Sequence, residues 1–377
     1  MIKRVLDEGI KTYLFRKKAI IVLGPRQSGK TTLIKQILED YSSDTILLNG
    51  DDPTIQQILT RPNTEQIKQI IGNKKLVFID EAQRIKDIGI TSKIVVDNFP
   101  VVQIILSGSS AFELSQSTNE PLTGRKWSFQ LWPVSWEEWQ NHIGYLESEM
   151  DLENRLVFGF YPDVLNNRDN PVRVINELID SYLYKDVLMY GNLKKPEEIQ
   201  KLLQAISWQV GSEVSYRELG EIINLDPKTV ERYISILEKA FVLFKLPSFS
   251  RNLRNEIKLG KKIYFFDNGI RNGVIGQFMM FQARQDKGAI WENFLMSERQ
   301  KFLNYTNSYA KSYFWRTVQQ QEIDYIEEVD GKLYAYEFKL NEKRKVKFST
   351  TFTNNYSAEY KLVNRSNFRD FVIQKNT

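Results

Sequence analysis

The sequence predicts an α/β fold in which a parallel sheet forms the first of several domains. Three apolar segments, residues 19–23, 76–79 and 101–106, have the length and composition of buried strands. Helical patterns separate them, and strands that alternate with helices are typical of a parallel sheet covered on both faces. A chain of 377 residues is long enough for about two or three domains.

The composition favours a folded protein and excludes several kinds of chemistry. Hydrophobic residues make up 42% of the chain and aromatic residues 12%, which is enough for sizeable cores. The chain has no cysteine and a single histidine, His142, so disulfides, thiolate metal sites and histidine clusters are excluded. We find neither an apolar run that could span a bilayer nor a signal-peptide pattern, and expect a cytoplasmic protein without a membrane partner. The net charge of +5 mildly favours polyanionic partners.

The first strand runs directly into a glycine-rich loop and an amphipathic helix, in the stretch "AIIVLGPRQSGKTTLIKQIL". The loop fits the pattern G-x-x-x-x-G-K-[ST], which brings backbone N–H groups and a helix N-terminus to phosphate oxygens. Lys30 is expected to reach the β- and γ-phosphates of ATP, and the Thr31 hydroxyl to ligate Mg²⁺. The residues predicted to bind the nucleotide in this segment are Gly24, Pro25, Arg26, Gln27, Ser28, Gly29, Lys30, Thr31 and Thr32.

The second strand, in "KKLVFIDEAQRI", ends in two acidic residues. We expect Asp80 to act on the metal side of the nucleotide, and Glu81 to be the catalytic base that orients water on the γ-phosphate. An isolated acidic strand end is more often a turn or a cap. The phosphate loop some fifty residues earlier makes the catalytic interpretation the better one.

The third strand ends in small hydroxyl residues, of which Ser107, Ser109 or Ser110 could sense the γ-phosphate; ordinary turn chemistry is the alternative. We include Ser109 among the predicted nucleotide contacts. Arg125 is the candidate for stabilising charge during phosphoryl transfer, either in its own subunit or in a neighbouring copy of a homo-oligomer. The alternative is a surface arginine that packs on Trp127.

These motifs, with "LSGSS" and "LTGR…LWPVSWEEW" following in order, resemble the AAA-type ATPases of bacteria and archaea that carry a conserved C-terminal domain of unknown function. The resemblance continues through "GFYPDVL", "YLYKDVL" and "YFFDNGIRN", and so covers nearly the whole chain. It implies a RecA-like P-loop NTPase domain, which we place at residues 1–145. A mostly helical connector is expected over residues 146–210.

Residues 211–265 have the order of a winged helix-turn-helix, with two capped helices followed by strand sequence. Ser215 and Glu218 predict a capping box for the first helix, and Asp226-Pro227 opens the second, which extends to about Lys239. The alternative to DNA binding is a module that only packs between its neighbours. The residues expected on the exposed face of the second helix are Lys228, Thr229, Arg232 and Tyr233.

A predicted hairpin in the last segment, "EIDYIEEVDGKLYAYEFKL", brings like charges together. Asp-Gly suits a two-residue turn, which sets Val329 opposite Lys332 and Asp324 opposite Glu337. Lys339 shares the face of Glu337, because strand side chains alternate. Two opposed carboxylates destabilise a sheet, and a divalent cation would remove their repulsion.

A helix with Glu292, followed by strands with Asp324 and Glu-x-Lys, resembles the core of the PD-(D/E)xK nucleases, a restriction-endonuclease-like α/β domain at residues 266–377. Ile323 replaces the usual proline. The resemblance implies Mg²⁺ or Mn²⁺ held by Glu292, Asp324 and Glu337, with Lys339 lowering the pKa of the attacking water or stabilising charge on a phosphate. The basic run Lys343, Arg344, Lys345 and Lys347 would suit a nucleic-acid backbone.

The sequence therefore predicts an enzyme that hydrolyses ATP and is coupled to nucleic acid, expected to be DNA, with a metal-dependent nuclease-like C-terminal domain. The alternative is a nucleotide-controlled scaffold or regulator. In that case Lys339 only neutralises Glu337 or Glu322, and the C-terminal domain binds DNA or a protein partner without cutting. A third possibility is an ATPase that acts on protein partners.

Overall fold

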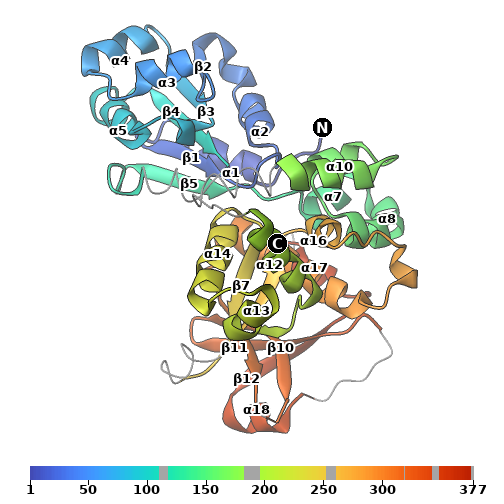
Figure 1. The fold of residues 1–377 in the computed structure, drawn as a ribbon. Coiled ribbons are helices and arrows are strands. Elements are labelled where there is room, and N and C mark those ends of the chain that lie inside the picture. Colours follow the sequence, from blue (N-terminus) through green and yellow to red (C-terminus); the bar gives the residue numbers. More distant parts are fainter. Residues whose placement is uncertain (110–117, 182–195, 252–259, 318, 342–347, 375–377) are drawn as a thin grey trace. The chain divides into compact units, whose positions relative to one another are not determined.

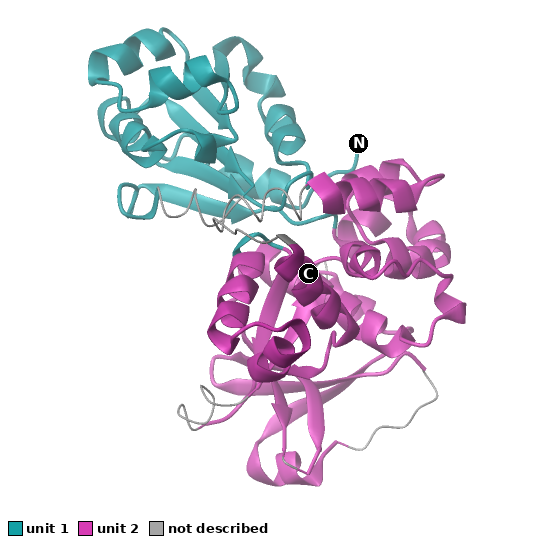
Figure 2. Cartoon of the chain, in the orientation of Figure 1, with its two compact units in different colours: residues 1–134, 239–241 teal, residues 135–238, 242–377 magenta. Residues whose placement is uncertain are grey.

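The computed structural model describes residues 1–109, 118–181, 196–251, 260–317, 319–341 and 348–374. Many of its elements are labelled in Figure 1. The chain forms two compact units, shown in Figure 2: unit 1 comprises residues 1–134 and 239–241, and unit 2 comprises residues 135–238 and 242–377. Three features singled out in the sequence lie outside the described residues: Ser110, the stretch "YLYKDVL", and the basic run from Lys343 to Lys347.

Unit 1 is built on a five-stranded parallel sheet with the strand order β2-β3-β4-β1-β5. The strands are β1 (Ala19–Leu23), β2 (Thr45–Asn49), β3 (Leu76–Asp80), β4 (Gln103–Gly108) and β5 (Lys126–Gln130). The α/β class and the parallel sheet predicted from the sequence are thus confirmed. The predicted strand at residues 19–23 has the observed bounds, whereas the one at 101–106 begins two residues later.

Both faces of this sheet are buried. On one face, strand residues such as Ile21, Val77 and Leu106 share a hydrophobic core with side chains of α3, α4 and α5. Ile20 and Phe78, which point to the other face, are also fully buried. The helices of unit 1 are α1 (Leu6–Thr12), α2 (Lys30–Ile37), α3 (Pro53–Leu59), α4 (Thr64–Ile71) and α5 (Ile88–Asn98), with short 3-10 turns η1 (Glu39–Asp44) and η2 (Ala82–Arg84). Burial on both faces explains why the strands are continuously apolar.

Unit 2 begins with helices and a small sheet. The helices are α7 (Trp136–Ile143), α8 (Tyr145–Phe158), α9 (Pro162–Asn166), α10 (Pro171–Leu178), α12 (Pro196–Trp208), α13 (Tyr216–Ile223), α14 (Pro227–Lys239) and α16 (Asn268–Val274), followed by η4 (Phe281–Ala283). The sheet consists of β6 (Glu213–Val214), β7 (Leu243–Pro247) and β8 (Lys261–Phe265), in the order β6-β8-β7. No helix among the described residues combines the length and the apolar character needed to cross a membrane.

The end of unit 2 is a long helix followed by a four-stranded sheet, in the order β12-β11-β10-β9. The elements are α17 (Lys287–Tyr305), β9 (Lys311–Arg316), β10 (Glu322–Val329), β11 (Lys332–Phe338), α18 (Thr350–Asn355), β12 (Ala358–Val363) and α19 (Arg369–Val372). Strands β9, β10 and β11 are antiparallel neighbours, and β12 runs parallel to β11. Val329 pairs with Lys332, as the sequence predicts, because the Asp330-Gly331 turn has two positive φ angles.

The motif "DNGIRN" forms a buried network of hydrogen bonds rather than an exposed binding site. The Asp267 carboxylate accepts the backbone N–H of Phe160 at 2.7 Å, and the Asn268 side chain donates to carbonyls in α8 and α17. The Arg271 guanidinium donates to the Ser207 carbonyl at 2.8 Å and pairs with Asp286 at 2.5 Å. These bonds join segments far apart in the sequence, so we assign the motif a structural role.

Candidate nucleotide site and carboxylate cluster

The glycine-rich loop leaves β1 and enters α2 at Lys30, and its glycines are required by the backbone. Gly24 lies against the carbonyl of Leu131, where a Cβ atom would come within 2.0 Å of the oxygen. Gly29 has a φ angle of 94° at the start of α2, in the left-handed region that favours glycine. The helix N-terminus thus opens onto the loop, where its unpaired N–H groups suit an anion.

Lys30 is buried in the loop that it would serve. Its ammonium group donates to the carbonyls of Gly24 at 3.0 Å and Pro25 at 2.8 Å. Burial lowers the pKa of Lys30 to about 8, although Glu81 and Asp80 favour the charged form. A bound phosphate would satisfy this ammonium group more strongly than neutral carbonyls do.

Asp80 ends β3 beside the first turn of α2. Its carboxylate accepts the Thr31 hydroxyl at 2.7 Å and also accepts the hydroxyl of Ser107 from β4. A threonine hydroxyl and a carboxylate in contact are the oxygen donors that Mg²⁺ prefers beside a nucleotide. The described side chains therefore fit the predicted Mg²⁺ at this point.

Glu81 follows Asp80 in a left-handed conformation, with a φ angle of 48°. Such a conformation is uncommon for residues other than glycine and is often found at functional sites. The Glu81 carboxylate accepts the side-chain amide of Gln83 at 2.6 Å, and the same amide reaches the Ser109 hydroxyl at 3.1 Å. Gln83, to which the sequence assigned no role, thus connects the predicted base with the predicted sensor.

Arg4 is a second residue that the sequence did not single out. It lies just before α1 and is 7% exposed. Its guanidinium group donates to the Ser28 carbonyl of the loop at 2.8 Å and to the Trp132 carbonyl at 2.6 Å. Arg4 therefore links the glycine-rich loop by hydrogen bonds to the segment that follows β5, and we regard it as a positioning residue.

We expect Arg4→Ala to weaken ATP binding about tenfold, because two charge-assisted hydrogen bonds that hold the loop are lost. The dissociation constant of a fluorescent ATP analogue measures the effect. Arg16→Ala is the matched control, since Arg16 is exposed and donates to the Thr12 carbonyl of its own segment at 3.4 Å rather than to the glycine-rich loop. Equal affinities for wild type and Arg4→Ala would show that the loop does not depend on this residue.

Arg125 does not lie at the glycine-rich loop of its own unit. It precedes β5, which runs parallel to β1 with Ala19 opposite Lys126, so Arg125 is at the amino end of the sheet. The loop leaves β1 at the carboxyl end, five residues further along the strand, or roughly 16 Å away. The Arg125 guanidinium pairs instead with Asp97 at 2.6 Å. This geometry leaves no role for Arg125 in its own site, and the role in a neighbouring copy stays a prediction.

In unit 2 the structure brings Asp324, Glu337 and Lys339 together. The Lys339 ammonium lies 2.9 Å from Glu337 and 3.4 Å from Asp324, and Asp324 also accepts the backbone N–H of Phe338 at 2.7 Å. Burial and the neighbouring Asp324 carboxylate raise the pKa of Glu337 to about 7. The repulsion between the opposed carboxylates of the predicted hairpin is therefore reduced by the Lys339 ammonium and by the raised pKa of Glu337.

Glu292, the third predicted metal ligand, is bound by side chains of the small sheet. Its Oε1 atom accepts the Tyr264 hydroxyl at 2.7 Å and lies 3.2 Å from the ammonium group of Lys262. Lys262 also lies 2.5 Å from Glu322. Lys262 and Tyr264 come from β8, some thirty residues before Glu292, and nothing in the local sequence marks them as partners of this carboxylate.

The predicted metal centre of unit 2 is not supported by this arrangement. Among the residues that the structure describes, no group of three or more carboxylate or histidine side chains is placed to hold one metal ion. The physical reason is that Lys262 and Tyr264 both contact Oε1 of Glu292, and the Lys262 ammonium places a positive charge beside this carboxylate. The side chains present thus do not fit the ion that the nuclease resemblance implies.

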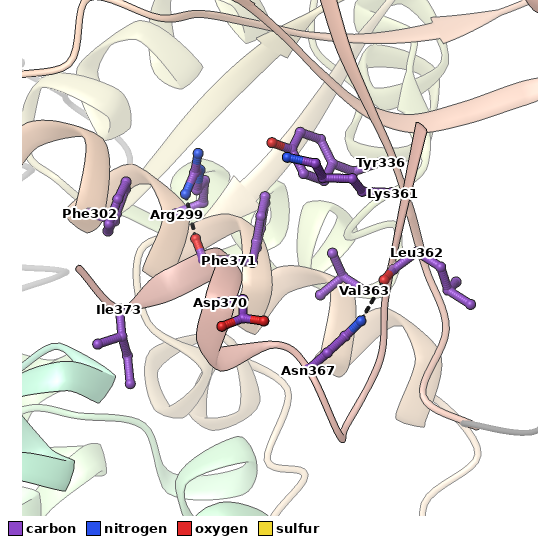
Figure 3. Close-up of a pocket in the computed structure, with 10 residues that line it drawn as sticks. All are labelled: Arg299, Phe302, Tyr336, Lys361, Leu362, Val363, Asn367, Asp370, Phe371 and Ile373. Carbon is purple, nitrogen blue, oxygen red and sulfur yellow. Dashed lines mark hydrogen bonds between the residues drawn. The ribbon is translucent and has the colours of Figure 1, made fainter. Parts of the chain in front are cut away.

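A hollow of about 580 Å³ lies elsewhere in unit 2, between α17, β11, β12 and α19 (Figure 3). Its arginine, Arg299, donates to Glu327 at 2.6 and 2.8 Å and to the Phe371 carbonyl at 2.5 Å. Figure 3 shows the last of these bonds and the one from Asn367 to the Leu362 carbonyl. Because the charge of the guanidinium group is already paired with the Glu327 carboxylate, we assign no anion site to this hollow.

The glycine-rich loop, the helix that starts at Lys30, and Asp80 at the end of a parallel strand define unit 1 as a P-loop NTPase domain. Within that class, residues 16–140 match the family model described as an AAA domain, which supports an AAA-type ATPase. Residues 149–280 and 287–376 match two models described as domains of unknown function, DUF8612 and DUF4143.

Sequence similarity to other proteins extends over most of the chain. An uncharacterized protein of Mycobacterium bovis is 25% identical over 337 residues, which cover 88% of this chain and 72% of that protein. An uncharacterized protein of Methanocaldococcus jannaschii is 23% identical over 91% of this chain and 79% of its own length. The RuvB Holliday junction branch migration motor of Thermotoga maritima aligns with 70% of this chain and 92% of its own, with 16% identity and a TM-score of 0.32.

Proposed function

We propose that the protein hydrolyses ATP at the glycine-rich loop of unit 1. The observation that carries this proposal is the convergence of four side chains from two places in the sequence. Lys30 and Thr31 open α2, Asp80 ends β3 in contact with Thr31, and Glu81 follows with its carboxylate held by Gln83. P-loop NTPases use these residue types to bind phosphates, to hold Mg²⁺ and to orient the attacking water.

Each residue has a distinct part in this proposal. Lys30 exchanges its two carbonyl partners for the β- and γ-phosphates, and the N–H groups of the loop bind the remaining phosphate oxygens. Thr31 and Asp80 would hold Mg²⁺, which screens phosphate charge when it is bound. Glu81 orients and deprotonates the attacking water, while Ser109 and Gln83 fix the direction of its carboxylate. Phosphate release that requires Mg²⁺ and Lys30 tests the proposal.

We further propose that unit 2 binds nucleic acid through a winged helix-turn-helix. The order α12, β6, α13, α14, β7, β8, with β8 between β6 and β7 in the sheet, supports this assignment. Lys228 and Arg232 are exposed on α14. Tyr233, which the sequence placed on the same face, is instead buried and donates to Glu198 of α12 at 2.8 Å. The four-part division at residues 145, 210 and 265 remains part of this proposal.

We expect Lys228→Ala with Arg232→Ala to weaken DNA binding by about the same factor for all sequences and to flatten its dependence on salt, because two phosphate contacts are lost. Fluorescence anisotropy with duplexes of unrelated sequence, at several salt concentrations, measures both effects. The matched control replaces Arg173 and Lys201, which are also exposed in unit 2. An unchanged salt slope would leave α14 with a packing role.

For the C-terminal sheet we propose a binding role without cleavage. The order of a helix, three antiparallel strands, a helix and a parallel strand supports the resemblance to the PD-(D/E)xK core. Glu292, however, is held by Lys262 and Tyr264. These contacts of Glu292 favour the scaffold alternative over metal-dependent cleavage. A nuclease assay with Mg²⁺ or Mn²⁺ tests it, and cleavage lost in Asp324→Asn would reverse the assignment.

A further inference from the structure

We propose that the ammonium group of Lys262 is the built-in cation of the carboxylate cluster in unit 2, in the place that the nuclease resemblance gives to a divalent metal ion. The cluster consists of Glu292, Glu322, Asp324 and Glu337. This inference rests on the non-cleaving role proposed above, and it adds the residue responsible for that role.

Lys262 is buried and paired with two carboxylates of the cluster. Its side chain is 2% exposed, and its Nζ atom lies 2.5 Å from Glu322 and 3.2 Å from Glu292. A lysine is rarely so buried unless it is paired. Two carboxylates at these distances favour the charged form of this buried amine, because each is an opposite charge in contact with it.

The Glu292 carboxylate is enclosed by side chains of β8 and by the backbone of Gly211. Tyr264 and Lys262 both contact its Oε1 atom. The backbone of Gly211 covers the carboxylate so closely that a Cβ atom there would come within 3.2 Å of Oε1. A divalent ion at Oε1 would have to displace both donors, and an ion at the other carboxylate oxygen would still lie beside the buried ammonium group of Lys262, which repels it.

The carboxylates of the cluster are balanced by side-chain cations. Among the described residues, its four carboxylates face the cations Lys262, Lys339 and Arg316, the last at 3.9 Å from Glu322. Arg316 also lies 3.8 Å from Glu213. Lys262 contacts Glu292 and Glu322, and Lys339 contacts Asp324 and Glu337, so each of the four carboxylates has a cationic partner without a metal ion.

Lys262→Met tests the inference, because methionine keeps the length of the side chain and removes its charge. In nucleotide-free wild type we expect no saturable heat on titration with MnCl₂ and no shift of the melting temperature. In Lys262→Met we expect a melting temperature lower by roughly 10 °C, because buried carboxylates lose their partner. We also expect saturable Mn²⁺ binding that restores several degrees. Tryptophan fluorescence reports mainly on this unit, which contains Trp136, Trp139, Trp208, Trp291 and Trp315 of the seven tryptophans.

Lys245→Met is the matched control, because Lys245 lies on the neighbouring strand β7 and pairs with Glu238 at a more exposed position. It should neither lower the melting temperature by as much nor create a Mn²⁺ site. If Lys262→Met does not fold, the double variant Lys262→Met with Glu292→Gln should fold better, because it removes one of the unpaired charges. Failure of the double variant to fold better would count against the pairing.

Two results would overturn the inference: saturable Mn²⁺ binding to wild type that Asp324→Asn abolishes, or a folded Lys262→Met variant that neither loses stability nor gains Mn²⁺. These outcomes are independent of the nuclease assay. A wild-type protein that cuts DNA would refute the non-cleaving role. A wild-type protein that cuts nothing but binds Mn²⁺ at Asp324 would refute only the role of Lys262.

Discussion

Lys30→Ala is expected to weaken ATP binding about 100-fold or more. The Lys30 ammonium is buried at the glycine-rich loop, and its removal takes the predicted charge-assisted donor away from the β- and γ-phosphates. Isothermal titration with a non-hydrolysable ATP analogue measures the change. Lys35→Ala is the control, because Lys35 lies in the same helix but is exposed. Retained affinity in Lys30→Ala would place the nucleotide elsewhere.

The pH dependence of this binding provides a second readout. Burial lowers the pKa of Lys30 to about 8 in the free protein. Phosphates favour the charged form, so ATP affinity is fully present below this pKa and is lost as the pH rises through it. We expect wild-type affinity to fall between about pH 8 and pH 10, and the residual affinity of Lys30→Ala to lack this fall.

Glu81→Gln is expected to bind ATP with wild-type affinity and to lower the turnover number by about 10²- to 10⁴-fold. The amide keeps the size and the polar contacts of the side chain but cannot accept the proton of the attacking water. Steady-state phosphate release and the dissociation constant, measured on the same samples, separate binding from turnover. Glu65→Gln, an exposed change in α4, is the control. Turnover at the wild-type rate in Glu81→Gln would exclude Glu81 as the base.

The parts of the site that depend on a local pattern could be predicted from the sequence. The glycine-rich loop is a continuous motif, and the acidic end of β3 follows from an apolar run that stops at two carboxylates. The hairpin register follows from the Asp-Gly turn alone, because a two-residue loop fixes which residues pair. In each case, the determining residues lie within about twenty positions of one another.

The remaining contacts depend on tertiary structure, which no local pattern encodes. Arg4 binds carbonyl groups of residues 28 and 132, and any residue type can supply a carbonyl. Lys262 meets Glu292 only because β8 lies beside α17. Tyr233 was assigned to an exposed face because helical periodicity defines faces but does not show which face α12 covers. The predicted metal centre is unsupported for the same reason, because local sequence does not show that Lys262 and Tyr264 contact Glu292.

Phosphate release from the full-length protein, with and without Mg²⁺ and beside Lys30→Ala prepared in the same way, tests the central claim most directly. We expect release that requires Mg²⁺ and disappears in the variant, because the proposed site of hydrolysis is the loop around Lys30. Release at equal rates from wild type and Lys30→Ala, or no release from wild type under any of these conditions, would contradict it.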